Sequence, residues 1–283
     1  MLLNNHAGIL LFYLLPYHWV WNLLNNKEKI SLLNASKIFN NRIFAKPENY
    51  DIIHKRPDSY KEAKNGKIIQ YVLEKYRPTS VLEIGPGSGF YLRQFLDFPS
   101  VKEYTAVDIV KEFTDYIKRF VLLNGEEKKV DLICGDFLET KFNKKFDLVV
   151  FMSALHHITD RTSFVEMCAS LLSDNGRMVF IEPHHGLPRI FRLLKKYIKH
   201  HHKRQYWQDA KNIPTHHYLS LAEIKYLSRK AKLRISELSF FSIVRGDRHL
   251  SSIFKPRLGF FSCSSFNPLS LCAQDLYVLL EKR

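Results

Sequence analysis

Residues 81–92 read VLEIGPGSGFYL, and this stretch decides the fold because a short apolar run changes into a turn rich in glycine. The apolar, partly β-branched start is typical of a buried strand. The glycines stand at alternate positions, Gly85, Gly87 and Gly89. Without β-carbons, they let backbone amides approach a ligand and let the next helix pack on the strand. The stretch therefore predicts a strand, a turn and a helix beside a nucleotide-like ligand.

The spacing of these glycines separates two classes of ligand. A dinucleotide fingerprint reads G-x-G-x-x-G, and Phe90 stands where its third glycine belongs. The pattern from Glu83 to Gly89 is instead acidic-x-G-x-G-x-G, which resembles the first motif of the class I S-adenosylmethionine-dependent methyltransferases. The resemblance implies S-adenosylmethionine as cofactor, bound by Glu83 and the three glycines. The Glu83 carboxylate would favour the ammonium and sulfonium of that cofactor, directly or through water.

Two further acidic residues follow predicted strands. Residues 103–107 form the second strand, and Asp108 at its end stands 23 residues beyond Gly85. In related dinucleotide folds an acid near this place accepts hydrogen bonds from the ribose hydroxyls. The same carboxylate can also cap the helix expected at 110–123. We expect Glu83, Asp108 and a third acid, Asp136, to converge on one pocket.

Asp136 and Phe137 follow the short strand predicted at 130–134. The resemblance implies that the Asp136 side chain meets the adenine amino group and that the neighbouring backbone amide, at Phe137, meets the adenine ring. The alternative for this pair is a solvated turn.

The run 146–152, FDLVVFM, predicts a central parallel strand covered on both faces. His156 and His157 follow it, and ligands of open α/β sheets bind outside the carboxyl ends of strands. The Asn/Asp-Pro-Pro-aromatic motif of base-methylating enzymes is absent here. The Leu-His-His sequence resembles the small-molecule branch, the methyltransferase type 11-like proteins, which includes enzymes of quinone and other lipid-like substrates.

Methyl transfer to a hydroxyl needs a base, and histidine titrates near neutral pH. His156 or His157 is the first candidate for a catalytic base, followed by His184 or His185. The alternative for each is a structural histidine that bonds loop carbonyls. His200, His201 and His202 are consecutive and point in different directions on a helix, so we expect no metal site.

Strand and helix patterns alternate along the chain. They predict a Rossmann-like, doubly wound α/β fold whose seven-stranded sheet has an antiparallel last strand. The later elements are expected as a helix at 161–172, a turn at 174–176, a strand at 177–181, a helix at 219–230 and strands at 233–244 and 275–280. We place an N-terminal hydrophobic segment and connector at 1–57 and the methyltransferase domain at 58–283. Lid insertions interrupt this domain at about 184–217 and 245–272.

The net charge of +15 is unevenly distributed, because seven basic residues and no acid lie between Arg189 and Arg204. Apolar and basic residues of this segment fall on opposite faces of a helix. Such a helix suits an anionic membrane surface or a membrane-bound substrate, and the alternative is a lid with a solvated basic face.

Residues 7–24 are mostly apolar and lack Lys, Arg, Asp and Glu. Three interpretations stay open: a membrane-spanning helix, a segment lying on a membrane surface, and a helix packed on the domain or capping its pocket. The four cysteines form no C-x-x-C pair, which indicates a reduced, cytoplasmic protein, with membrane association left open.

The sequence thus predicts methylation of a small-molecule or lipid-like acceptor at oxygen, without a nucleic-acid partner. Positive charge keeps an RNA or protein methyltransferase as an alternative, although no base-specific motif supports it. A non-catalytic module that binds the cofactor is another alternative. An oxidoreductase would require NAD binding by the glycine turn.

Overall fold

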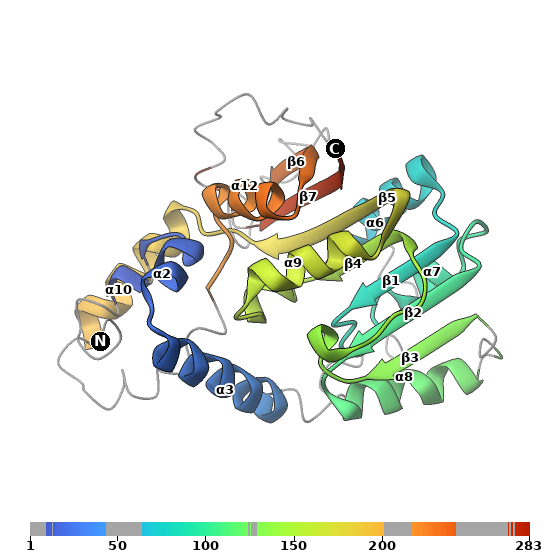
Figure 1. The fold of residues 1–283 in the computed structure, drawn as a ribbon, viewed down its shortest axis with the longest axis horizontal. Coiled ribbons are helices and arrows are strands. Elements are labelled where there is room, and N and C mark those ends of the chain that lie inside the picture. The colour runs from blue at the N-terminus through green and yellow to red at the C-terminus, as the bar shows by residue number, and fades with distance from the viewer. Residues whose placement is uncertain are drawn as a thin grey trace, which may run out of the picture.

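The computed structural model describes residues 10–12, 14–43, 64–123, 125, 129–200, 217–241, 271, 273 and 275–283. At its centre lies a seven-stranded sheet with the order β3-β2-β1-β4-β5-β7-β6 (Figure 1). The strands are β1 (Ser80–Ile84), β2 (Glu103–Asp108), β3 (Val130–Cys134), β4 (Phe146–Met152), β5 (Leu172–Pro183), β6 (Leu233–Phe241) and β7 (Asp275–Lys282).

Neighbouring strands from β3 to β5 are parallel, and β7 runs antiparallel between β5 and β6. The predicted fold class is therefore confirmed. The chain builds β1, β2 and β3 outward and then returns to place β4 on the other side of β1. Ligands of open α/β sheets bind at such a reversal, outside the carboxyl ends of the strands.

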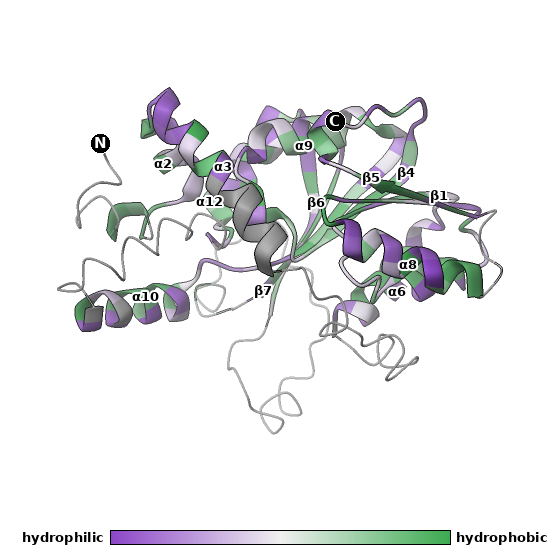
Figure 2. Cartoon of the chain, turned by 90° about the horizontal axis from the view of Figure 1, so that it is seen from below, coloured by the Kyte–Doolittle hydropathy of each residue, from purple (hydrophilic) through white to green (hydrophobic). Residues whose placement is uncertain are grey.

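Helices cover both faces of the sheet, as Figures 1 and 2 show together. Helices α6 (Lys64–Tyr76), α7 (Leu92–Leu96) and α8 (Lys111–Leu123) cover one face, and α9 (Arg161–Ser170) and α12 (Leu221–Lys230) cover the other. Helices α2 (Tyr17–Leu23), α3 (Asn26–Ile43) and α10 (Leu187–His200) lie to one side of the sheet in Figure 1. The 3₁₀ turns η3 (Phe137–Glu139) and η4 (Leu155–His157) follow β3 and β4. Along β4, Leu148 and Val150 join a core with α6, α7 and α8. Val149 and Phe151 join the opposite core, with α9 and α12. The period of two in a strand therefore buries both faces.

One predicted turn is wrong. Residues 174–176 lie inside β5, where the pairing with β4 shifts register. Phe146 pairs with Leu172, but Leu148 pairs with Arg177, so β5 carries a bulge between these pairs. A β-carbon on Gly176 would lie 2.7 Å from the Phe146 carbonyl oxygen. Glycine is therefore needed here for close backbone approach within the sheet, and its presence does not mark the end of the strand.

Several helix limits also differ from the sequence predictions. The helix after the glycine turn begins at Leu92, because residues 87–91 form turns. Helix α9 ends at Ser170, two residues before the predicted end, and α12 begins at Leu221, two residues after the predicted start. Ser220 caps α12, because its side chain accepts a hydrogen bond from the Glu223 amide. The proposed domain boundary at 57/58 and most of the insertion at 245–272 lie outside the described residues.

The described part of the N-terminal hydrophobic segment packs on the domain. Tyr17 and Val20 of α2 are buried, and the His18 ring stacks on Tyr226 of α12 with centroids 4.5 Å apart. Trp19 and Leu23 remain 53% and 66% exposed. Among the described residues, no helix has both the length and the apolar character needed to cross a bilayer.

The bulge in β5 generates a stability prediction. Replacement of Gly176 by alanine places a β-carbon against backbone atoms that cannot move aside, so we expect a loss of roughly 1–3 kcal/mol in the free energy of unfolding. Urea denaturation measures it. Gly135→Ala is the matched control, because its β-carbon would meet only the Thr140 hydroxyl at 3.8 Å. Equal midpoints for Gly176→Ala and wild type would contradict the bulge geometry.

Candidate functional site

A cavity of about 490 Å³ lies at the carboxyl ends of β1, β2, β3 and β4. Its wall includes the glycine turn after β1, the segment after β2, the start of η3 and the loop after β4. One residue from the N-terminal helices, Leu33 of α3, completes the wall. The sequence-predicted residues on it are Gly85, Gly87, Asp108, Asp136, Phe137, His156 and His157.

The three glycines of the turn have a left-handed backbone. The φ angles of Gly85, Gly87 and Gly89 are +67°, +56° and +73°. A β-carbon on Gly85 would come within 3.1 Å of the Ala154 β-carbon, whereas one on Gly87 would meet nothing within 4 Å. Gly87 is thus required by its backbone conformation alone, and it leaves open space on the ligand side of the turn.

Asp108 ends β2 and serves the local backbone in two ways. Its Oδ1 accepts a hydrogen bond from the Val110 amide at 2.9 Å, and its Oδ2 accepts one from the Gly87 amide at 3.1 Å. The side chain is nearly buried yet borders the cavity. Burial raises the pKa of Asp108 to about 6, and the two amide donors oppose that rise. The carboxylate therefore fixes the glycine turn and faces the ligand space at once.

Asp136 and Phe137 occupy the adjacent part of the wall. Asp136 Oδ1 accepts a hydrogen bond from the Leu138 amide at 3.1 Å and so caps η3. The Phe137 ring is buried against Phe164, with centroids 5.1 Å apart. These contacts hold an acidic side chain and an aromatic residue beside Asp108.

Glu83 does not belong to the cavity wall. It is 2% exposed, and its carboxylate accepts a hydrogen bond from the Tyr104 hydroxyl within the core on the α6–α8 side. Burial raises the pKa of Glu83 to about 7, although the Tyr104 hydrogen bond opposes the rise. The structure thus brings Asp108 and Asp136 to the cavity and leaves Glu83 behind the glycine turn.

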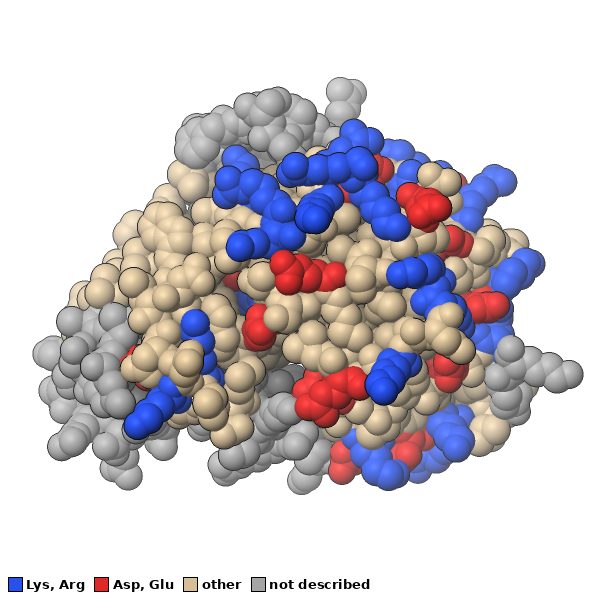
Figure 3. Space-filling model, viewed as in Figure 1, with Lys and Arg blue, Asp and Glu red and all other residues tan. Residues whose placement is uncertain are grey.

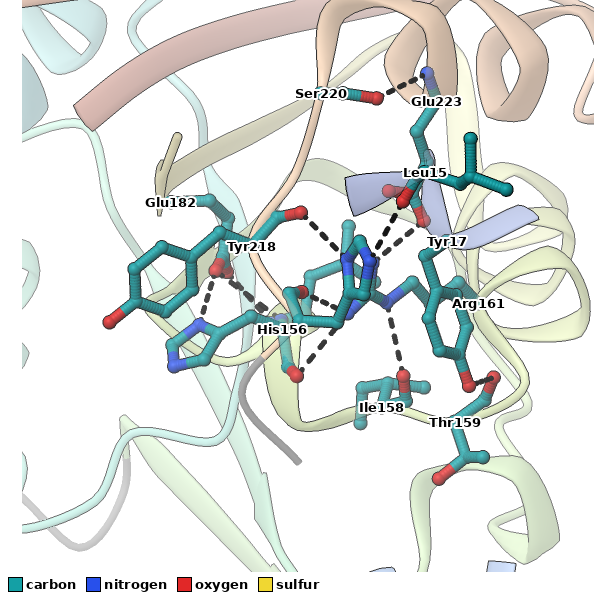
Figure 4. Close-up of polar contacts among 12 residues, drawn as sticks. Leu15, Tyr17, His156, Ile158, Thr159, Arg161, Glu182, Tyr218, Ser220 and Glu223 are labelled. Atoms are coloured by element: carbon teal, nitrogen blue, oxygen red, sulfur yellow. Dashed lines mark hydrogen bonds and ion pairs between the residues drawn. The ribbon is translucent and has the colours of Figure 1, made fainter. Parts of the chain in front are cut away.

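His156 and His157 lie on the wall in η4, after the strained residue Ser153, whose φ is +53°. Glu182, at the end of β5, fixes this loop by accepting hydrogen bonds from its backbone amides. Its Oε1 accepts the Ala154 and Leu155 amides at 2.8 and 2.7 Å (Figure 4 shows the surrounding contacts).

The second oxygen of Glu182 contacts the imidazole. His156 Nδ1 lies 2.7 Å from Glu182 Oε2, and both side chains are buried. In a neutral ring this contact places the proton on Nδ1, because a carboxylate only accepts hydrogen bonds, and the lone pair on Nε2. The sequence analysis missed Glu182 in this role. The available signal was an acid at a strand end, one strand away from the two histidines.

The second pair of candidate histidines lies elsewhere. Among the described residues that line the cavity, neither His184 nor His185 is present. His184 Nδ1 is 3.2 Å from the Ala273 carbonyl oxygen, and His185 stacks on His217 with centroids 5.0 Å apart. Burial lowers the pKa of His185 to about 4. Their surroundings are those of structural histidines. His201 and His202 lie outside the described residues.

Comparison with known proteins identifies the family. Residues 82–180 match the sequence model of a family described as a methyltransferase domain. These residues form a methyltransferase domain, and the resemblance to the class I S-adenosylmethionine-dependent methyltransferases is confirmed. The matched range covers β1 to β5 and thus both the glycine turn and the histidine loop of this methyltransferase.

Two curated relatives show the range of similar sequences. The methyltransferase is 26% identical to a ubiquinone biosynthesis O-methyltransferase of Xanthomonas axonopodis pv. citri, over 65% of this chain and 75% of the relative. It is 28% identical to a malonyl-[acyl-carrier protein] O-methyltransferase of Acetivibrio thermocellus, over 52% of this chain and 53% of that relative. The chain thus spans about half the length of the second relative.

Solved structures share the fold at low sequence identity. The plantazolicin methyltransferase BamL, in complex with a triazolic desmethylPZN analog and SAH, is 16% identical with a TM-score of 0.53, and the match covers 90% of this chain and 97% of BamL. An S-adenosylmethionine-dependent methyltransferase from Clostridium acetobutylicum is 13% identical with a TM-score of 0.50, covering 85% and 96%.

The cofactor of the family is S-adenosylmethionine, and the wall of the cavity fits it. Gly87 leaves open space above the turn, Asp108 offers carboxylate oxygens at the strand tip, and Phe137 stands next to Asp136. The ribose hydroxyls of the cofactor need hydrogen-bond acceptors, its adenine needs apolar surface, and its cationic amino acid part needs negative charge nearby.

Proposed function

We propose that this methyltransferase transfers a methyl group to an oxygen atom of a small-molecule or lipid-like acceptor. The observation that carries the proposal is the buried pair of His156 and Glu182 at the cavity wall. A carboxylate acceptor is already ionised at neutral pH, whereas a hydroxyl acceptor has to lose a proton during transfer. A histidine whose tautomer is fixed by a carboxylate suits the second case. Both curated relatives named above are O-methyltransferases, which supports oxygen as the acceptor atom.

For the cofactor, we propose roles that follow the wall of the cavity. The glycine turn accommodates the methionine part, the Asp108 carboxylate accepts both ribose hydroxyls, and Asp136 with Phe137 receives the adenine. Glu83 adds negative charge behind the turn, which favours the cofactor's cationic groups through the intervening backbone or water. The bound cofactor provides an electrophilic methyl group on a sulfonium.

The protein's own contribution to the chemistry is alignment and proton removal. Nε2 of His156 accepts the proton of the acceptor hydroxyl, and Glu182 stabilises the imidazolium that results. Glu182 also fixes the loop backbone through the Ala154 and Leu155 amides, so the imidazole is oriented before the acceptor binds. His157, which lines the same cavity, is the second candidate for this role.

For the partner, we propose an anionic membrane surface contacted by α10. Phe191 and Ile198 are 64% and 69% exposed, and exposed basic side chains, Arg192, Lys195 and Lys199, lie beside them. Hydrophobic and hydrophilic residues alternate along α10, which lies at one end of the molecule (Figure 2). Exposed apolar residues flanked by cations are typical of interfacial helices.

The surface near α2 provides a second, uncharged area that could face the membrane in this proposal. In Figure 3, Lys and Arg gather over α12, whereas the surface over α2 is largely free of charged side chains. The exposed Trp19 ring belongs to this helix. Aromatic side chains of this kind favour the headgroup region of a bilayer.

The raised pKa of Asp108 predicts a pH dependence of cofactor binding. Ribose hydroxyls donate to the ionised carboxylate, so binding competes with the proton that the buried group holds below its pKa of about 6. The affinity for S-adenosylhomocysteine, measured by calorimetry, should therefore rise about tenfold between pH 5 and pH 7 and then level off. Asp108→Asn should abolish this dependence and weaken binding at pH 7.5 by roughly 10- to 100-fold.

A matched variant separates the two buried carboxyl groups. Glu83→Gln removes the group whose pKa is about 7 and should keep the rise near pH 6. An Asp108→Asn variant that binds S-adenosylhomocysteine as tightly as wild type would contradict the ribose assignment.

The pair of His156 and Glu182 predicts a dependence on the acceptor class. With labelled S-adenosylmethionine and a panel of phenols, His156→Ala should lower kcat by about 10²-fold or more, because a positioned base is lost. Glu182→Gln should lower kcat less, because the imidazole remains while the imidazolium loses its carboxylate partner.

Long-chain carboxylic acids are the control acceptors for this experiment, since they need no base. Affinity for S-adenosylhomocysteine should stay within about twofold of wild type in both variants. Phenol methylation that survives alanine at His156, His157, His184 and His185 would overturn the proposed base.

The exposed face of α10 predicts binding to vesicles that contain anionic phospholipid. Reversing two charges with Lys195→Glu and Lys199→Glu should weaken partitioning onto phosphatidylglycerol-containing vesicles by about 30-fold or more, at roughly 1 kcal/mol for each lost cation. Sedimentation at low salt measures it. The control is Lys118→Glu with Lys225→Glu, which makes the same charge change on α8 and α12. Equal effects of the two double variants would contradict a role for α10.

A further inference from the structure

The N-terminal helices contribute to the cavity itself. We define the N-terminal cap as the described residues between 10 and 43. Leu33 of its helix α3 lines the cavity, whereas all other residues of the wall lie between Ile84 and Phe164 of the domain. Leu32 beside it is buried, whereas Ile30, one turn earlier, is 57% exposed. The cap therefore presents a specific apolar side chain to the ligand space.

A buried cluster fixes the cap to the domain. We call it the Arg161 junction, and it consists of Tyr17, Thr159, Arg161, His217 and Glu223. The Arg161 guanidinium carbon lies 4.2 Å from the Tyr17 ring centroid, and the Tyr17 hydroxyl donates to the Thr159 carbonyl at 2.9 Å (Figure 4). Arg161 Nη1 donates to Glu223 Oε1 at 2.7 Å. Arg161 and Glu223 are 2% and 0% exposed, so this ion pair depends on complete contacts around it.

His217 adds a second attachment. Its Nε2 lies 2.9 Å from the carbonyl oxygen of Phe12 and 3.0 Å from that of Leu15, and both are residues of the cap. Burial holds the pKa of His217 well below its usual value, and both ring nitrogens face carbonyl oxygens, since Nδ1 lies 3.1 Å from that of Tyr218. The backbone of the cap is thus held by a domain side chain.

The same guanidinium also holds the rim of the cavity. Arg161 Nε donates to the Ile158 carbonyl at 3.1 Å, and Nη2 donates to the His156 carbonyl at 3.3 Å. Ile158, Thr159 and His156 all line the cavity. One buried cation therefore connects the cap to the loop that carries the candidate base.

We propose that the N-terminal cap forms the acceptor-facing wall of the active site and that Leu33 sets the size of the apolar group that fits there. The inference rests on the proposed function for the identity of the reaction. The strand tips provide the polar groups that suit the cofactor, whereas Leu33 and Ile158 provide apolar surface on the wall of the same cavity as His156. Arg161 and Tyr17 are positioning residues in this arrangement, because they act through the rim and the cap.

The test measures binding of para-alkylphenols, from methyl to hexyl, to the complex of the full chain with S-adenosylhomocysteine. Calorimetry gives each affinity without requiring turnover. Leu33→Trp should weaken hexylphenol by about tenfold or more and methylphenol by no more than about twofold, because the added volume shortens the site. Leu33→Ala should shift the preference toward the longer chains. Ile30→Ala, on the exposed side of the same helix, should leave the series unchanged.

The junction is tested with two variants of Tyr17. Tyr17→Phe keeps the ring over Arg161 and should change hexylphenol affinity by less than about threefold. Tyr17→Ala removes the ring and should weaken hexylphenol about tenfold while S-adenosylhomocysteine affinity stays within about threefold. Hydrogen exchange in residues 26–34 should increase only in the alanine variant, which shows loosening of the cap and no loss of the sheet.

The outcomes separate this inference from the proposed function. If phenols bind with a length preference that depends on Leu33 but accept no methyl group, the assignment of Leu33 to the acceptor wall stands and oxygen methylation is overturned. Methylated phenols whose length preference is the same in Leu33→Trp, Ile30→Ala and wild type would overturn the wall. Absence of phenol binding to the wild-type complex would also overturn it.

Discussion

The active site depends on the close approach of two backbone segments, the turn after β1 and the loop after β4. A β-carbon on Gly85 would lie 3.1 Å from the Ala154 β-carbon, so the two segments meet only because one residue lacks a side chain. This contact places the glycine turn in the same cavity wall as His156, two residues beyond Ala154. β1 and β4 are adjacent in the sheet, at the point where the strand order reverses. The sheet topology therefore brings these two segments together.

Buried carboxylates organise the loops around that contact. Glu182 accepts two loop amides and the His156 imidazole, and Glu223 pairs with Arg161. Buried charges require partners, so each of these groups restricts the positions that its loop can occupy. Glu83 follows the same rule by its hydrogen bond with Tyr104. Glu182 and Glu223, the latter through Arg161, thus restrain the loop that carries His156.

Helices α2 and α10 each bury some apolar side chains and expose others. Tyr17 and Val20 are buried, while Trp19 and Leu23 on the same short helix face outward. Phe191 of α10 is also exposed, although the neighbouring turn of that helix is anchored by Leu193. Both helices therefore join the domain through one face and expose apolar side chains on another.

The sequence by itself determined the order of strands and helices, the glycine turn and the tips at Asp108 and Asp136, because each follows from local periodicity or turn chemistry. Only the tertiary structure decided what depends on distant contacts. It placed Glu83 in the core, kept residues 174–176 inside β5, and joined His156 to Glu182 and Tyr17 to Arg161. These pairs are separated by many residues and leave no periodic trace, since side-chain partners across a sheet are selected by packing and burial.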